Sequence, residues 1–330
     1  MVALILLLLL VATGSAVVAA PTTSSDDLEQ RVSQLEAALE RAKHEDKVRR
    51  GSTIFARACA ACHGRSGRGD GPAAADLDPL PRDLASRQFR FRTTPSGEAP
   101  HAEDLARTIR RGLPGTWMPA FGSVFSASEI DDLVGFIDSL RAEDSLPDAP
   151  PEPLPIPSIP PPGPSTLDEG RAVYLLSGCW RCHGLDGSGR GPSSRGLTDE
   201  NDRPIGTTDF RYDPFKGGQE PEDIARTLLT GLNGAPMPSY GEAMVFARED
   251  VEVTSTFTDM LTHEDLEALE AYIRAAPPRV RVDELGEAGH LELRDRRLAA
   301  LAHYVLSFDR RTGFWYRFLR QRPEQQARKP

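Results

Sequence analysis

The sequence predicts an all-α protein of two tandem domains, and three observations support this fold class. A segment of the chain repeats at a displacement of 119 or 120 residues, apolar residues recur at helical spacing, and prolines crowd the stretch between the repeats. An internal repeat implies two similar domains, and spacings of three and four residues indicate amphipathic helices. A chain of 330 residues has room for two domains of ordinary size.

The first domain is expected at residues 51–140. A helix with Phe55 on its apolar face opens this segment. At its other end, Ser126 and Glu129 have the spacing of a capping box, and the apolar residues that follow predict a closing amphipathic helix that runs to Leu140.

The second domain is expected at residues 166–310, with an insertion near 242–290. Two segments resemble the closing helix of the first domain, Leu261–Ile273 and Leu298–Phe308. Only one of them can take that place. The second has the better pattern, but the sequence leaves the choice open.

Residues 1–20 contain no charged side chain and include the apolar run Leu4–Val11. This pattern is typical of a signal peptide, but it is also just long enough for an N-terminal membrane anchor. Both interpretations place the rest of the chain in the periplasm or at the outer face of the cytoplasmic membrane.

Residues 26–50 are expected to form a helical spacer. Apolar residues recur there at alternating steps of four and three, at Leu28, Val32, Leu35, Leu39 and Ala42. This heptad stripe fits a coiled-coil or docking helix, or a solvated spacer. Two heptads are short for a stable coil, which favours the spacer.

Two further segments flank the second domain. Residues 146–165 hold ten prolines and predict an extended, semi-rigid linker. Residues 311–330 are basic and aromatic, and either dock on a partner or an anionic membrane, or pack back on the domain.

The motif Cys-x-x-Cys-His occurs once in each repeat, and it is the attachment signature of c-type haem. Two thiols at this spacing can add to the two vinyl groups of one porphyrin, and the histidine then lies beneath the iron. The separation of the two motifs does not fit a zinc site. The sequence therefore predicts two covalently attached haem c groups, held by Cys59, Cys62 and His63 in the first domain and by Cys179, Cys182 and His183 in the second.

Each repeat also offers a methionine as the sixth iron ligand. Met118 follows its motif histidine by 55 residues and Met237 follows its own by 54, and both precede a proline in a loop rich in glycine and proline. Thioether ligation raises the reduction potential of a haem. Met244 and Met260 remain alternatives in the second domain.

The quoted motifs and loops resemble class I cytochrome c domains, and their tandem order resembles di-haem cytochromes of bacterial respiratory chains. This resemblance implies electron transport in the periplasm between protein partners such as an oxidoreductase, an oxidase or another cytochrome. Arg107 and Arg226 are equivalent in the two repeats. They either neutralise a haem propionate or are exposed residues retained from the duplication.

The net charge and the predicted iron ligands argue against some classes of function. The formal charge of −10 argues against nucleic-acid binding. The sequence favours an electron carrier and not an enzyme, because both predicted irons have two protein ligands. The alternatives are a haem enzyme, either a di-haem peroxidase or a sulfur-compound dehydrogenase, and a cytochrome subunit of a membrane respiratory complex. In an enzyme, His101 or His263 could displace a methionine.

Overall fold

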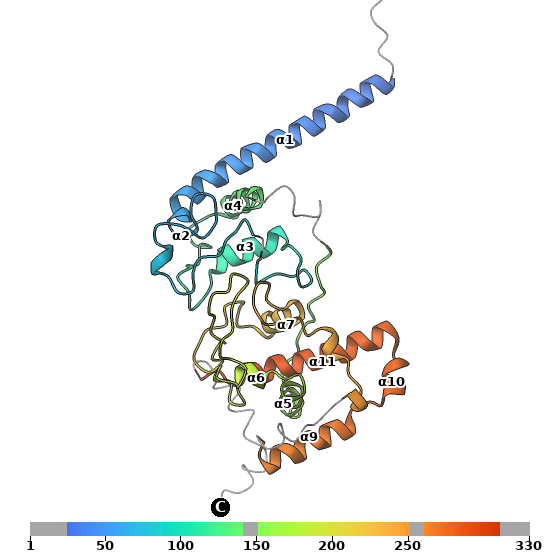
Figure 1. The fold of residues 1–330 in the computed structure, drawn as a ribbon. Helices are drawn as coiled ribbons and strands as arrows, with labels where there is room; N and C mark the ends of the chain where they lie inside the picture. The colour runs from blue at the N-terminus through green and yellow to red at the C-terminus, as the bar shows by residue number, and fades with distance from the viewer. Residues whose placement is uncertain (1–24, 87, 141–150, 251–260, 311–330) are drawn as a thin grey trace, which may run out of the picture. The chain divides into compact units, whose positions relative to one another are not determined.

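A computed structural model describes residues 25–86, 88–140, 151–250 and 261–310. Within these ranges the elements are helices, with one isolated bridge between Thr198 and Pro204 and no strand (Figure 1). The prediction of an all-α fold is confirmed. The chain divides into two compact units, Met1–Asp46 and Lys47–Pro330, and both repeats lie in the second.

The first domain is built on α1 (Ser25–Ala58), α2 (Ala60–His63), α3 (Ala102–Arg111) and α4 (Ala127–Ser139), with a short 3-10 turn, η1 (Ala74–Asp76). The predicted spacer and the opening helix of this domain are therefore one continuous helix.

The last turns of α1 cross α4 at close range. A Cβ on Gly51 would lie 2.0 Å from the carbonyl oxygen of Asp132, so only glycine fits at this crossing. One turn further on, the rings of Phe55 and Phe136 lie 5.0 Å apart. At the start of α4, the Ser126 hydroxyl accepts a hydrogen bond from the Glu129 amide, which confirms the predicted capping box.

The second domain repeats this arrangement with α5 (Thr166–Leu176), α6 (Trp180–His183), α7 (Pro221–Thr230) and α11 (Gly286–Leu306). A Cβ on Gly170 of α5 would lie 2.1 Å from the carbonyl oxygen of Ala300 on α11. The rings of Tyr174 and Tyr304 meet edge to face at 5.4 Å. Thus α11 crosses α5 as α4 crosses α1.

The stretch between α7 and α11 contains η2 (Glu242–Met244), η3 (Arg248–Asp250), α9 (His263–Ala275) and α10 (Arg279–Asp283). Arg297 of α11 is fully buried and ties this stretch to the domain. Its Nη1 donates to the carbonyls of Met244, at 2.7 Å, and Phe246, at 3.1 Å. Its guanidinium carbon lies 3.6 Å from the centre of the Phe246 ring.

The described part of the proline-rich linker lies against both domains. Proline removes backbone donors and leaves the extended chain with free carbonyls, which histidines can reach. His101 Nε2 donates to Pro151 O and His303 Nε2 donates to Pro160 O, both at 2.8 Å. Ile159 is 8% exposed and belongs to the core of the second domain. The described part of the linker is therefore bound to both domains.

No helix among the residues that the structure describes is long and apolar enough to span a membrane. The predicted signal or anchor (1–20), the basic tail (311–330) and Met260 lie outside the described residues.

Candidate functional site

A glycine-rich loop folds back over each Cys-x-x-Cys-His motif and holds its backbone. In the first domain, the amides of Gly69 and Gly71 donate to the carbonyls of His63, at 2.8 Å, and Cys62, at 3.1 Å. A Cβ on Gly71 would lie 2.3 Å from the carbonyl oxygen of Ala61, so the loop can approach this closely only with glycine.

The second domain makes the same bonds. The amides of Gly189 and Gly191 donate to the carbonyls of His183, at 2.9 Å, and Cys182, at 3.0 Å. The glycines that repeat in the sequence are therefore the residues that fix both motifs. The sequence showed their recurrence but not the carbonyl groups that they contact.

The ring of each motif histidine is oriented by a backbone carbonyl. His63 Nδ1 lies 3.0 Å from the carbonyl oxygen of Arg82, and His183 Nδ1 lies 3.3 Å from that of Thr208. Because a carbonyl only accepts, Nδ1 carries the proton and Nε2 keeps its lone pair for a metal. Burial lowers the pKa of His63, and it lowers the pKa of His183 to about 4, so both rings are neutral near pH 7.

The four cysteines are free thiols and half-buried. Burial raises the pKa of Cys59 to about 11 and that of Cys179 to about 12. These two thiols are therefore neutral at pH 7, and each packs against the apolar cluster of its domain.

Each candidate methionine lies in a loop that closes on itself. The amide of Leu113 donates to the carbonyl of Met118 at 3.0 Å, and the amide of Leu232 donates to that of Met237 at 2.9 Å. Each loop also returns to the helix before it, since the amide of Phe121 donates to Ile109 O at 3.0 Å in the first domain.

Both methionines are half-buried, and each packs on the same apolar cluster as the first motif cysteine of its domain. Met118 and Cys59 share one cluster, and Met237 and Cys179 share the other. The two donor sets fit haem c. Each combines two free thiols, an imidazole with Nε2 available, and a thioether on the same apolar cluster.

The other candidates have different surroundings. Arg107 and Arg226 are 18% and 11% exposed at the side chain, and each pairs with the aspartate one turn earlier on its helix. They are not exposed residues, and a role toward propionates stays a prediction. Met244 is fully buried.

The two histidines considered as replacements for a methionine ligand, His101 and His263, have other surroundings. His101 is bound to the linker, as described above. His263 on α9 is 88% exposed at the side chain and faces Glu267. Within the described ranges, no group of three His, Cys, Asp or Glu side chains is arranged to hold a metal ion.

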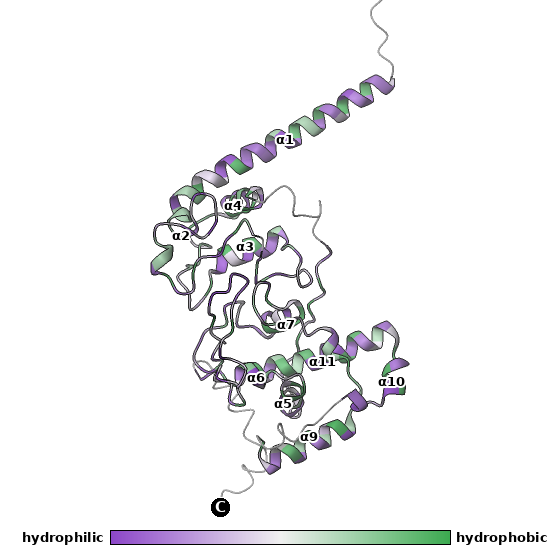
Figure 2. Cartoon of the chain, viewed as in Figure 1, coloured by the Kyte–Doolittle hydropathy of each residue, from purple (hydrophilic) through white to green (hydrophobic). Residues whose placement is uncertain are grey.

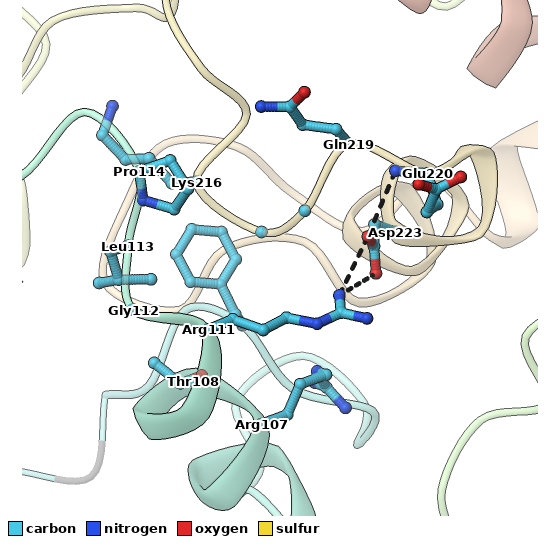
Figure 3. Close-up of a pocket in the computed structure, with 13 residues that line it drawn as sticks. Arg107, Thr108, Arg111, Gly112, Leu113, Pro114, Lys216, Gln219, Glu220 and Asp223 are labelled. Carbon is cyan, nitrogen blue, oxygen red and sulfur yellow. Dashed lines mark hydrogen bonds and ion pairs between the residues drawn. The ribbon is translucent and has the colours of Figure 1, made fainter. Parts of the chain in front are cut away.

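A cavity of about 240 Å³ marks the seam between the two domains (Figure 3). Arg111 at the end of α3 reaches across it, and its Nη1 lies 3.2 Å from both carboxylate oxygens of Asp223 on α7 (Figure 3). Lys216 and Arg107 also line the cavity. This ion pair connects the two domains through α3 and α7, which are equivalent helices of the repeats.

Comparisons with known proteins agree with this geometry. A sequence model of the family "Cytochrome c" matches residues 48–141 and 167–277. No curated protein sequence matches the chain. The chain is similar to a chain of the Kuenenia stuttgartiensis reducing HAO-like protein complex Kustc0457/Kustc0458, with 28% identity and a TM-score of 0.59, over 79% of this chain and 96% of that one.

The second family match ends at residue 277 and so includes α9, whereas α11 is the helix that crosses α5. The close contact at Gly170 places α11 in the position that α4 has in the first domain. With a family match in each of its two domains, the chain belongs to the cytochrome c family.

Proposed function

We propose that this chain is a di-haem c-type cytochrome that carries electrons between redox proteins, in the periplasm or at the outer face of the cytoplasmic membrane. One observation carries the proposal. The same donor set, a Cys-x-x-Cys-His motif with its histidine Nδ1 on a carbonyl and a methionine on the same cluster, is built twice. Membership of the cytochrome c family supports the role of a haem-based electron-transfer protein.

The residues that would hold the first haem are Cys59, Cys62, His63 and Met118, and those for the second are Cys179, Cys182, His183 and Met237. When bound, each iron supplies a one-electron ferric/ferrous couple. The protein restricts motion at the site. The carbonyls of Arg82 and Thr208 fix the imidazole planes, and the glycine-rich loops fix the motif backbone. A rigid ligand set needs little rearrangement when the charge on the iron changes.

An enzyme would need an exchangeable iron position with a proton donor beside it. The two histidines considered as replacements for methionine are held elsewhere. His101 is bonded to the linker, and His263 lies exposed on α9. This placement favours a carrier over a peroxidase or a sulfur-compound dehydrogenase.

The test of the carrier function is ligand binding by the purified holoprotein. We expect two haems per chain, and no change in the ferrous spectrum on adding carbon monoxide, because both irons have two protein ligands. The variant Met118→Ala should bind carbon monoxide at one of its two haems. Carbon monoxide binding by the wild-type protein, or rapid turnover of peroxide, would contradict the carrier function.

A second candidate is the role of a cytochrome subunit in a larger redox complex. The similar chain from Kuenenia stuttgartiensis belongs to a protein complex, and this chain covers 96% of it. Native electrophoresis with haem staining should show a larger assembly in cell extract than the purified chain forms. Equal migration of the two samples would argue against a permanent complex. Sequencing the N-terminus of the mature protein would show whether Met1–Ala20 is retained as a membrane attachment.

A further inference from the structure

The first part of α1 is a helix with an unpartnered apolar stripe. Every residue from Ser25 to Glu45 is exposed, and apolar residues are interspersed among polar ones along this part of the helix (Figure 2). Four large apolar side chains are among them, with exposures of 52% at Leu28, 53% at Val32, 69% at Leu35 and 55% at Leu39. The other end of the same helix is buried, with Phe55 only 1% exposed.

These four side chains and Ala42 follow a heptad repeat. Steps of four and three residues put Leu28, Leu35 and Ala42 at heptad position d and Val32 and Leu39 at position a. Such a repeat of 3.5 residues keeps one narrow seam facing a partner helix when two helices supercoil. An a/d seam is narrower than the apolar face of a helix that packs on a globular core.

The occupant that fits this seam is a second copy of the same helix. Val32 at a with Leu28 and Leu35 at d is the combination that favours a parallel two-stranded coil, while the second a position holds Leu39 and the last d position holds Ala42. In that arrangement position g of one helix meets position e of the next heptad in its partner, and these positions are Arg31 and Glu36. Their charges are opposite, so a parallel pair of copies gains two such contacts.

The charge of the segment argues against a lipid surface as the occupant. Asp26, Asp27, Glu29, Glu36, Glu40, Glu45 and Asp46 outnumber Arg31, Arg41 and Lys43. An anionic membrane surface repels such a helix, whereas helices that lie in that surface are rich in lysine and arginine.

The last turns of α1 are anchored in the first domain, which lowers the free-energy cost of nucleating the exposed part of the helix. Arg50 donates two hydrogen bonds to Asp132 of α4, at 2.7 and 2.8 Å, and Lys47 lies 2.8 Å from Asp131. Nucleation is the unfavourable step in forming a helix, and here the helix is already anchored by its last turns. We propose that Leu28–Ala42 forms a parallel coiled coil with the same segment of a second copy, so that two di-haem chains assemble through their N-terminal helices. The residues that carry this inference are not those of the proposed haem sites.

Sedimentation equilibrium of the full-length holoprotein tests the proposal. We expect a concentration-dependent dimer, and Leu35→Lys should leave a monomer at every concentration. Arg31→Glu places like charges at both contacts and should raise the dissociation constant about tenfold. Adding Glu36→Arg to that variant restores opposite charges and should restore the affinity. The matched control is Arg41→Glu, because the same charge change at an outer heptad position should leave the dimer intact.

A separate experiment tests whether the two helices of the coiled coil are parallel. In the proposed holoprotein all four native cysteines hold haem, so Leu28→Cys introduces a single free thiol. Parallel helices bring the two copies of this thiol together, and oxidation should yield a covalent dimer in high yield. The haem spectrum of each variant shows that it is folded. A wild-type protein that is monomeric throughout, a control that dissociates like Arg31→Glu, or a dimer that Leu28→Cys does not cross-link would overturn the proposal.

Discussion

Arg92 is the residue whose replacement should most clearly uncouple the two domains. It lies in the loop before α3, is fully buried, and reaches from the first domain to the end of α7 in the second. Its Nη2 donates to Thr230 O at 2.7 Å and its Nη1 donates to Gly231 O at 3.3 Å. Nε and Nη2 also donate to Pro95 O, at 3.2 and 3.1 Å. Burial lowers its pKa to about 10, so the side chain stays charged at pH 7.

The size of the effect follows from these contacts. Arg92→Met keeps most of the volume but removes every donor. The carbonyls of Thr230 and Gly231 lie at the C-terminal end of α7, where a cation is stabilising and free acceptors need partners. An unsatisfied buried acceptor costs about 1–3 kcal/mol, while removing the buried charge recovers part of its desolvation cost. We expect a net loss of about 2–4 kcal/mol in the free energy of unfolding.

The assay is urea unfolding of the holoprotein, followed by the weak near-infrared ferric band of methionine–iron ligation. The wild type should unfold in one transition, whereas Arg92→Met should unfold earlier, with the two domains separating. The matched control is Arg110→Met on α3. Its ion pair with Glu103 is exposed and should contribute less than about 1 kcal/mol. Equal midpoints for Arg92→Met and Arg110→Met would refute the reasoning.

Two further predictions concern the second domain. Gly170→Ala places a Cβ 2.1 Å from the carbonyl oxygen of Ala300 and should cost about 3 kcal/mol or more in the free energy of unfolding, measured in urea. Gly206→Ala, with no atom within 4 Å of the new Cβ, should change it by less than about 0.5 kcal/mol, and equal effects would contradict the crossing of α5 and α11. Burial lowers the pKa of His303 below 6.5, so its contribution to stability is complete above pH 6.5 and declines as the pH falls toward the folded pKa. His303→Gln should therefore lose less stability than the wild type between pH 7 and pH 5, and parallel pH profiles would show that this histidine is not the cause.

The elements around each motif could be predicted because their signals are local. The capping residues Ser126 and Glu129 and the apolar periodicity after them depend on neighbours within one or two turns, and the structure has this helix at Ala127–Ser139. The repeat also identified the glycines near each motif. These glycines act by contacting backbone carbonyl groups. Because every residue has such a group, the sequence does not indicate which carbonyls are contacted.

The contacts between the domains could not be predicted. Arg92 looks like any charged residue of a polar loop, and its partners in the second domain are carbonyl groups 138 and 139 residues away in the chain. The linker composition predicted a chain without helix, and residues 151–163 form no helix or strand, but its docking depends on His101 and His303, which are distant in sequence. The continuity of α1 past residue 50 was also hidden, because Gly51 disfavours a helix locally and its close contact with Asp132 of α4 is not visible in the sequence.

The most direct test of the central claim, two His/Met-ligated haems that carry electrons, is a spectroelectrochemical titration of the purified protein. The near-infrared ferric band should report methionine ligation at both centres, and both should have high potentials. Met118→Ala and Met237→Ala should each remove about half of the band. A centre of low potential without the band in the wild-type protein would contradict the account, because one of the two predicted methionine–iron bonds would then be absent.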